Sequence, residues 1–356
     1  MGQGIFLGIK VIFYLKSKSR GIANMLKNQE EYLHLKAVAF KQAIHKRKRL
    51  WRSLWTVIAF LSLVLAIGIW WDCVERQAHR KPEYAKESIL HLLQKENGKV
   101  QYSELQNGEL QHGLSASDYS LLCAQTGLSK VAIDAMYEQG RKQELLILQE
   151  KLFADVQIAC NANTIISREE KLKDTTACIP YVENGDILIS FNCHAIGWRN
   201  GHAAIVVDAD NRQTLEARVL GSNSKIISMS HWEKYPSFVV LRLKGVSRQE
   251  RQQIAEYAKE NLVDVPYRLE AGIVEGITGW GQGFIQGWIQ GSMLQKDEGA
   301  EVAVSGTHCA HLVWSAYNEF GYNLDSDGGL IVTPHDIYQS PYLEVIQIYG
   351  MPLKGL

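Results

Sequence analysis

The segment GTHCAHLVWSAYNEFG, residues Gly306–Gly321, decides how the fold of this chain is interpreted. Its apolar residues recur at the i, i+3, i+4, i+7 spacing of an amphipathic helix. They are Leu312, Val313, Ala316, Tyr317 and Phe320. Thr307 is expected to cap the start of this helix and Gly321 to end it. Cys309 then lies in the first turn, on the same apolar stripe.

Cys309 is a candidate nucleophile because of its place in this helix. The unpaired backbone N–H groups and the positive end of the helix dipole favour a thiolate over a thiol. The alternative is a cysteine that only packs in the core, since free cysteines are among the most buried residues. The helix alone favours the core cysteine, so the nucleophile hypothesis depends on the rest of the chain.

The pattern changes to short strands from Ile179 onward. Apolar runs predict strands over 185–190, 201–208, 214–219, 238–243 and 343–349. Turn residues at 208–213 indicate that the second and third strands form an antiparallel hairpin. A capping box over Ser247–Glu250 opens a helix that extends to Leu262. This order predicts an α+β fold with an antiparallel sheet.

Two polar residues of the hairpin give the cysteine its context. His202 opens one strand and Glu216 lies in the next. A catalytic thiolate needs an imidazole that takes and returns its proton, and the imidazole needs a polar partner that fixes its tautomer. Because side chains alternate across a strand, both residues share a face only with a suitable register or a β-bulge. Otherwise His202 is a capping or core histidine, and Glu216 is a solvated strand residue.

Four motifs follow one another in the chain: Gly185-Asp-Ile-Leu, Gly201-His-Ala-Ala-Ile-Val, Leu215-Glu-Ala and His308-Cys-Ala-His-Leu-Val-Trp. In this order they resemble the circularly permuted branch of the NlpC-type papain-like cysteine hydrolases, which includes the lecithin retinol acyltransferase relatives. The resemblance extends from residue 179 to residue 350. It implies a permuted papain-like domain in which Cys309 is the nucleophile, His202 the base and Glu216 the orienting residue.

The chain departs from the family pattern directly after the nucleophile. Relatives usually have Cys-Ser-Glu-Leu where this chain has Cys-Ala-His-Leu, so the role of His311 is open. The segments Asp325–Gly329 and Thr333–Asp336 resemble the stretch after the Cys helix in some bacterial members. Tyr267 is a candidate hydroxyl donor to the oxyanion, with simple packing as the alternative.

Two metal sites are alternatives to this interpretation. His308, Cys309, His311 and His202 have the residue types of a zinc site. However, His308 and His311 are three apart on a helix, with Cys309 rotated away from both, which disfavours zinc. Asp325-Ser-Asp-Gly328 resembles the start of a calcium loop but lacks the Glu at position 12, so a turn is favoured. We therefore expect neither a metal nor a cofactor.

The zero formal net charge conceals two regions of opposite sign. Residues 1–53 hold 12 of the 38 Lys and Arg residues and 2 of the 38 Asp and Glu residues. The uncharged apolar run 54–71, with tryptophans at both ends, reaches the lower limit for a transmembrane helix. The positive-inside rule leaves the N-terminus cytoplasmic and the rest of the chain outside. A cleaved signal peptide and a buried core helix are the alternatives, and both are disfavoured by the long basic leader and the charge step.

The chain is thus expected to have four parts: a basic cytoplasmic tail (1–53), a transmembrane helix (54–71), a helical stalk or linker domain (72–178) and the papain-like domain (179–356). The tail either binds anionic lipid or only sets the topology. Residues 272–291 hold seven glycines among Ile, Trp and Phe, and are a lid, a membrane-facing loop or a simple insertion.

The remaining cysteines restrict the disulfide pattern. Cys73, Cys123, Cys160, Cys178 and Cys193 all follow the apolar run, and an odd number of cysteines cannot pair completely within one chain. Cys160 with Cys178 is a candidate bridge.

These features predict a membrane-anchored, extracytoplasmic bacterial cysteine hydrolase that cleaves an amide. From the family and the topology, the expected substrate is a peptide of cell-wall peptidoglycan. The alternatives are an acyltransferase or lipid hydrolase on the same fold, with a lipid-linked substrate, and a binding module without catalysis. No nucleic-acid partner is expected.

Overall fold

The computed structural model describes residues 18–19, 36, 40–42, 44–67, 78–94, 113–162, 167–195, 199–269, 271, 306–329 and 331–352. The chain divides into two compact units, Met1–Trp71 and Asp72–Leu356, and each is described by itself. Cys73 and the glycine-rich segment 272–291 lie outside the described residues.

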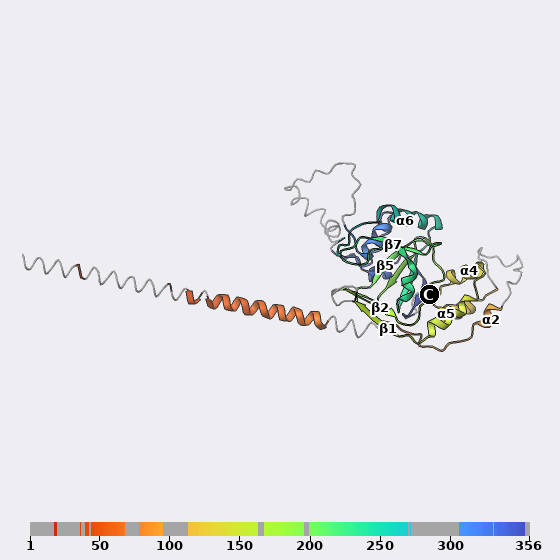
Figure 1. The fold of residues 1–356 in the computed structure, drawn as a ribbon, viewed down its shortest axis with the longest axis horizontal. Helices are drawn as coiled ribbons and strands as arrows, with labels where there is room; N and C mark the ends of the chain where they lie inside the picture. The colour runs from red at the N-terminus through yellow and green to blue at the C-terminus, as the bar shows by residue number, and fades with distance from the viewer. Residues whose placement is uncertain are drawn as a thin grey trace, which may run out of the picture. The chain divides into compact units, whose positions relative to one another are not determined.

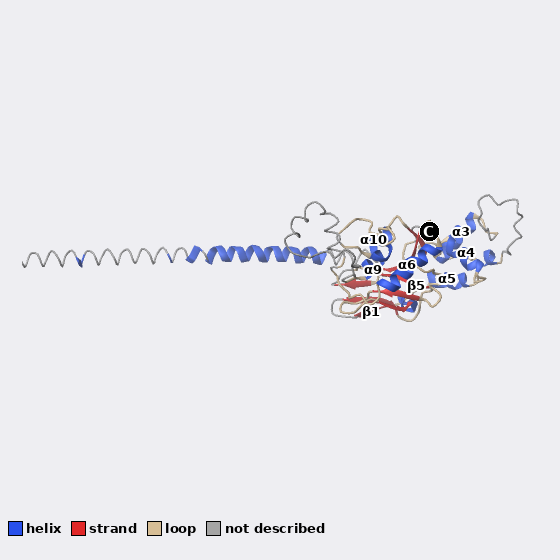
Figure 2. Cartoon of the chain, turned by 90° about the horizontal axis from the view of Figure 1, so that it is seen from above, coloured by secondary structure: helices blue, strands red, loops and turns tan. Residues whose placement is uncertain are grey.

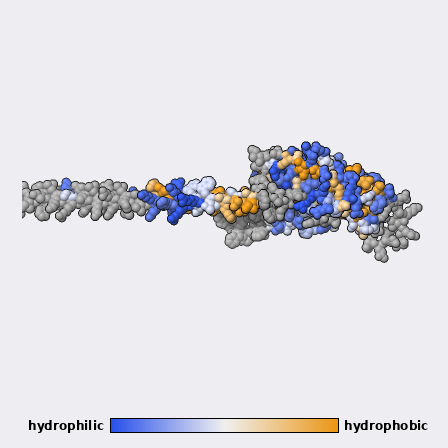
Figure 3. All heavy atoms as spheres, turned by 90° about the horizontal axis from the view of Figure 1, so that it is seen from below, coloured by the Kyte–Doolittle hydropathy of each residue, from blue (hydrophilic) through white to orange (hydrophobic). Residues whose placement is uncertain are grey.

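The first unit contains one helix, Phe40–Ile67, that is long and apolar enough to cross a membrane. It is the one such helix among the described residues, and every described residue in it is exposed. Figure 3 shows a hydrophilic stretch along this helix followed by a hydrophobic one. The predicted span 54–71 falls on the hydrophobic stretch as far as residue 67, and residues 68–71 lie outside the described residues.

The second unit is built on a six-stranded antiparallel sheet. The strands lie in the order β7-β6-β5-β3-β8-β9. Their bounds are β3 (Ile187–Ser190), β5 (His202–Asp208), β6 (Gln213–Glu216), β7 (Lys225–Ser228), β8 (Phe238–Leu243) and β9 (Leu343–Tyr349). The α+β class and the antiparallel hairpin of β5 and β6 are confirmed. The third predicted strand is shorter than expected, because the chain leaves the sheet after Glu216.

Alternating side chains of this sheet supply two separate cores. Leu188, Ala204 and Val206 belong to one core, whereas Ile187, Ala203 and Ile205 belong to the other. Because neighbouring residues of a strand point to opposite faces, both faces of the sheet are covered. This explains why β3, β5 and β8 read as nearly continuous apolar runs.

Helices of the C-terminal half cover one of these faces. They are α6 (Arg248–Asn261), α9 (Cys309–Asn318) and α10 (Pro334–Gln339), and α9 packs against β5. Figure 1 shows α6 on the opposite side of the strands from β1 and β2, and Figure 2 shows α6, α9 and α10 close together. The helix predicted from Ser247 is confirmed, with the Ser247 side chain as its N-cap.

The core that contains Leu188, Ala204 and Val206 joins the sheet to a group of helices from the segment expected to be a stalk. These are α2 (Leu90–Leu93), α3 (Ala116–Thr126), α4 (Lys130–Glu138) and α5 (Glu144–Phe153), of which α3, α4 and α5 lie together in Figure 2. Their buried side chains, among them Leu122 and Met136, share one core with Val206 and Trp232. The helices therefore fold as part of the same unit as the sheet.

A direct backbone joint links these helices to the last strand. The carbonyl of Gly127 accepts a hydrogen bond from the N–H of Ile348 at 2.7 Å, and the N–H of Ser129 donates to Ile346 at 2.9 Å. Gly127 has φ +72°, and a Cβ there would lie 2.2 Å from the carbonyl oxygen of Ile348. Only glycine fits this position without a backbone shift.

A second, three-stranded sheet was not predicted. It consists of β1 (Ile158–Ala162), β2 (Ser167–Leu172) and β4 (Cys193–Ala195) in the order β1-β2-β4. β1 and β2 lie within the segment 72–178, which was expected to be helical. Their sequence, IACNA and SREEKL, is too polar and too short to give a clear strand pattern. Cys160 on β1 and Cys178 are both free thiols, so the candidate bridge is absent from the described residues.

Candidate functional site

Cys309 is the first residue of α9, as the sequence predicted for a cysteine in the first turn. The predicted cap is wrong by one residue, because His308 and not Thr307 is the N-cap: its Nδ1 accepts from the backbone N–H of His311 at 3.4 Å. The Thr307 hydroxyl donates instead to the His308 carbonyl, at 3.2 Å. Cys309 is partly exposed as a residue and lines a cleft.

A β-bulge places His202 and Glu216 on the same face of the sheet. β5 and β6 pair Ile205 with Leu215, which leaves Glu216 opposite a residue two positions from His202. The extra residue is Val207, where the register shifts between Val206 and Asp208. If the strands paired from Asp208 and Gln213 onward without this shift, Glu216 would lie opposite Ile205, on the other face of the sheet. The geometric condition that the sequence set for this pair is met through the bulge.

Glu216 is fully buried, and its carboxylate is held by several donors. It accepts from Nε2 of His202 at 2.7 Å, from the hydroxyl of Thr214 at 2.6 Å and from Nε1 of Trp232 at 2.7 Å. The Nε2 of His231 lies 3.2 Å away. Burial raises the pKa of Glu216, but the hydrogen bonds and charges of the two histidines hold it well below its usual range. The carboxylate is therefore ionised.

The ring of His202 is held by a hydrogen bond to this carboxylate and by stacking on an indole. It stacks on Trp232 with ring centroids 5.4 Å apart and an interplanar angle of 13°. Because Glu216 occupies Nε2, the other ring nitrogen, Nδ1, is the one left to interact with Cys309. Sequence reasoning missed Trp232, which lies in the 3₁₀ helix η2 (Met229–Lys234) outside any predicted element. It also missed Thr214 and His231, because no local pattern ties them to Glu216.

The electrostatics of the site favour a thiolate and imidazolium pair. Burial raises the pKa of the Cys309 thiol, but the hydrogen bond and charge of His202, with the ring of His308 nearby, outweigh burial and lower this pKa to about 5. Burial lowers the pKa of His202, whereas its hydrogen bonds to Cys309 and Glu216 raise it to about 9. Between these two values the sulfur is negative and the ring is positive, as in activated cysteine nucleophiles.

The sulfur opens into a cleft of about 240 Å³. Polar residues of both sheets line this cleft, among them Glu169 on β2 and Arg218 after β6, which form an ion pair at 2.9 Å. Tyr267, the predicted oxyanion donor, lines the same cleft. Burial raises the pKa of Tyr267, and the nearby charge of Cys309 raises it further, so its hydroxyl stays protonated. The structure thus brings Cys309, His202, Glu216 and Tyr267 into one region.

Aliphatic side chains form the rim of the cleft. Leu220, Leu269 and Ile331 line it and are 49%, 38% and 40% exposed. Val219 and Val332 line the cleft as well. We call Leu220, Leu269 and Ile331 the apolar rim. Exposed aliphatic side chains gathered at a cleft are typical of a surface that meets an apolar ligand.

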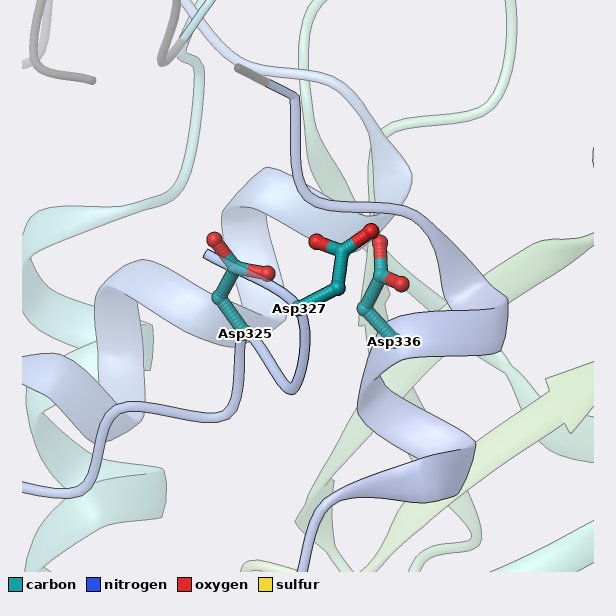
Figure 4. Close-up of side chains that lie close together, drawn as sticks. All are labelled: Asp325, Asp327 and Asp336. Atoms are coloured by element: carbon teal, nitrogen blue, oxygen red, sulfur yellow. The ribbon is translucent and has the colours of Figure 1, made fainter. Parts of the chain in front are cut away.

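Three carboxylates lie together between the end of α9 and the first turn of α10 (Figure 4). Asp325 and Asp327 come from the loop after α9, and Asp336 comes from α10; their oxygens lie within 4.8 Å of one another. Asp325 accepts from the N–H of Gly328, which is consistent with the predicted turn. Asp336 is occupied as part of a capping box with Thr333. In the described part of the chain this is the one such group, and the zinc combination of His308, Cys309, His311 and His202 forms none.

Comparisons with known proteins give little further information. No family model matches the chain, and no curated protein matches it. One solved structure, of the metalloprotein yiiX from Escherichia coli O157:H7 (DUF1105), is similar with 15% sequence identity and a TM-score of 0.32. The match covers 46% of this chain and 96% of that protein. A TM-score of this size supports no inference, so the function of this protein is inferred from the geometry of its own site.

Proposed function

We propose that this protein is a cysteine hydrolase that cleaves an amide bond through an acyl-enzyme at Cys309. One observation carries the proposal: the fully buried carboxylate of Glu216 holds His202 at 2.7 Å, and the ring of His202 in turn acts on the sulfur of Cys309. A nucleophile, a base and a residue that orients the base are the three parts of this chemistry. The order of these residues along the chain further suggests a permuted papain-like fold.

The reaction would proceed in two halves. The thiolate of Cys309 attacks the carbonyl carbon, a C–S bond forms, and the π electrons of the carbonyl move to its oxygen. When this intermediate collapses, the C–N bond breaks and the departing amine takes the proton from the imidazolium of His202. Water then attacks the thioester while His202 accepts one of its protons. When the second intermediate collapses, the C–S bond breaks, the acid is released, and the thiolate of Cys309 is left beside the imidazolium of His202.

We further propose that the helix Phe40–Ile67 anchors the protein in a membrane, with the N-terminus cytoplasmic and the catalytic unit outside. The basic residues before the apolar stretch support this orientation through the positive-inside rule. An amide substrate outside a bacterial membrane is most readily a cell-wall peptide. This substrate rests on the sequence resemblance and on the proposed orientation, not on a particular residue of the cleft.

Muropeptide digestion tests this function. The full-length protein in detergent is incubated with purified muropeptides, and new amines and carboxylates are measured by mass spectrometry. We expect cleavage by the wild type, none by Cys309→Ala, and a loss of at least about 10²-fold in His202→Ala, whose fold should stay intact. Full activity of Cys309→Ala would overturn the proposal.

The apolar rim favours a second candidate function. Leu220, Leu269 and Ile331 would suit an acyl chain, so hydrolysis or transfer of a lipid ester by the same thiolate is the alternative. Phospholipid in mixed micelles, in a parallel incubation, separates the two candidates. Release of fatty acid, or a Cys309-linked acyl group found by mass spectrometry, would assign the lipid function and exclude the muropeptide one if muropeptides stay intact.

The reactivity of the Cys309 sulfur tests the alternative that the protein is a binding module without catalysis. Burial raises the pKa of the Cys123 thiol to about 11, so Cys123 serves as an internal reference. We expect iodoacetamide to modify Cys309 much faster than Cys123 at pH 7, because the thiolate is the reactive form. Equal rates would leave the hydrolase proposal without its nucleophile.

A further inference from the structure

His308 has two ring nitrogens with different tasks. Its Nδ1 accepts the backbone N–H of His311 and caps α9. An imidazole nitrogen that accepts carries no proton, so in the neutral ring the proton lies on Nε2. The helix cap therefore fixes the tautomer, and it makes Nε2 a hydrogen-bond donor.

This donor has no partner in the described part of the chain. Nε2 of His308 is buried and makes no hydrogen bond, and the whole residue is 6% exposed. His308 nevertheless lines the cleft beside Cys309. A buried donor without a partner costs free energy, so its persistence at a cleft suggests that a ligand atom completes it.

The position of this nitrogen suits the oxygen of a substrate. His308 directly precedes the nucleophile, at the start of a helix whose first N–H groups have no partner within the helix. The carbonyl oxygen of a substrate attacked by Cys309 becomes negatively charged close to this helix end, where the dipole and the N–H groups favour an anion. A neutral side-chain donor there would add to the same stabilisation.

We propose that Nε2–H of His308 is an oxyanion donor, which hydrogen-bonds the negatively charged carbonyl oxygen of the tetrahedral intermediate at the N-terminus of α9. This inference rests on the proposed function, because an oxyanion forms only if Cys309 attacks a carbonyl. It gives His308 a catalytic role that the sequence did not predict. It also makes Tyr267, the donor expected from the sequence, one of two candidates in the cleft.

Two substitutions separate the tasks of the two nitrogens. In His308→Asn the amide oxygen replaces Nδ1 as a helix cap, since Asn is among the best N-caps, but no donor reaches the place of Nε2. In His308→Gln the longer amide places an N–H near the position of Nε2, and the cap is weakened. Tyr267→Phe, which removes only the hydroxyl, is the matched control for the other candidate donor.

The variants are compared as full-length protein in detergent, with p-nitrophenyl hexanoate as the probe. We expect kcat of His308→Asn to fall by about 10²–10³ with KM nearly unchanged, as for the loss of one oxyanion donor. We expect His308→Gln to retain at least about a tenth of kcat, although its unfolding temperature lies below that of His308→Asn. A peptide aldehyde that forms a hemithioacetal should lose affinity for His308→Asn by a similar factor.

Alkylation separates this inference from the proposed function. At pH 9, iodoacetamide should modify Cys309 at similar rates in the wild type and in both His308 variants, because alkylation forms no oxyanion. Wild-type kcat in His308→Asn, or equal losses in the Asn and Gln variants, would overturn the donor role and leave His308 as a helix cap. If the wild type itself does not form an acyl-enzyme, the proposed function fails instead.

Discussion

At the scale of single residues, the site depends on how Glu216 is held. A carboxylate with no exposed surface is stable only when its oxygens are paired, and here a hydroxyl, an indole and two imidazoles lie within hydrogen-bond distance. This ionised group fixes the ring of His202 and keeps it protonated beside the sulfur. Residues that do not contact Cys309 therefore influence its chemistry through His202.

The pH dependence of the reaction follows from two pKa values. Below the pKa of Cys309, about 5, the sulfur is protonated and cannot attack. Above the pKa of His202, about 9, the ring has lost the proton that the leaving group needs. We expect kcat/KM to be bell-shaped with limbs near these values, and iodoacetamide labelling of Cys309 to rise only through the acidic one. Labelling that first rises near pH 8.5, the usual range of a free thiol, would contradict the ion pair.

The Trp232→Phe substitution tests how much the indole hydrogen bond to Glu216 contributes to stability and activity. Phenylalanine keeps a ring that stacks on His202 but removes the Nε1 donor to Glu216. A buried carboxylate oxygen that loses a donor costs about 1–3 kcal/mol. We therefore expect the free energy of unfolding in urea to fall by this amount, with a smaller loss of kcat than in His202→Ala. An unchanged stability would show that this hydrogen bond contributes nothing.

The site could be predicted from the sequence only in part, and the reason is physical. Cys309 and His202 stand out because each lies at the end of a regular element, where its local pattern marks it. Trp232 comes from a 3₁₀ turn, and Glu169 from a polar strand, where no periodicity distinguishes a site residue from a surface residue. The roles of Cys309, His202, Glu216 and Tyr267 remain predictions, which the substitutions and the alkylation of Cys309 test.

At the scale of elements, the bulge at Val207 sets the face on which Glu216 lies. Deletion of Leu215 would shift Glu216 by one position, opposite Ile205, as pairing without the bulge would. Glu216 would then move to the face of the core that contains Ile205 and Leu241. A carboxylate without partners in that core would cost several kcal/mol. We expect the deletion variant to lose activity completely and to unfold at a much lower urea concentration.

The matched control is a glycine inserted after Asn211, in the turn between β5 and β6. A surface turn absorbs one residue at a small cost, and the insertion leaves both strands in register. We expect its stability and activity to stay close to those of the wild type. If this insertion were as harmful as the deletion, the hairpin as a whole, and not the register of Glu216, would be what the site requires.

The strands that could be predicted are those with long apolar runs. β5, β8 and β9 were predicted within one residue at each end, since both sides of these strands are buried or nearly so. β7 and the small sheet were missed, because their short, mixed sequences gain their structure from pairing with neighbours far along the chain. Such pairing is a tertiary effect and leaves little trace in a local pattern.

At the scale of the whole molecule, the helices α2 to α5 share a hydrophobic core with the sheet. We therefore expect the helices and the sheet to unfold together in one transition. Gly127→Ala tests this joint, because the new Cβ meets the carbonyl oxygen of Ile348 at 2.2 Å and φ is +72°. Gly140→Ala is the matched control, since φ is +70° but nothing lies within 4 Å. Positive φ alone costs Ala about 1–2 kcal/mol. We expect Gly127→Ala to lose clearly more than Gly140→Ala in a single transition, followed by circular dichroism and by tryptophan fluorescence.

Two separate transitions in the Gly127→Ala variant would contradict a common unit. The helices would then melt first and leave the sheet with its tryptophan signal intact. The backbone contact between Gly127 and Ile348 could not be predicted from sequence patterns. The segment up to residue 178 reads as helical and amphipathic, and such a pattern does not specify which surface its apolar face will cover.

The place of β9 in this arrangement has a consequence for how the protein matures. This strand pairs with β8 on one side and meets Gly127 on the other, although it is made more than two hundred residues after that glycine. Neither the helices nor the sheet can reach their final packing while the ribosome is still producing the middle of the chain. The nascent polypeptide must keep its apolar surfaces apart until residue 349 has emerged, so its yield in a cell should depend strongly on the chaperones that meet it during synthesis.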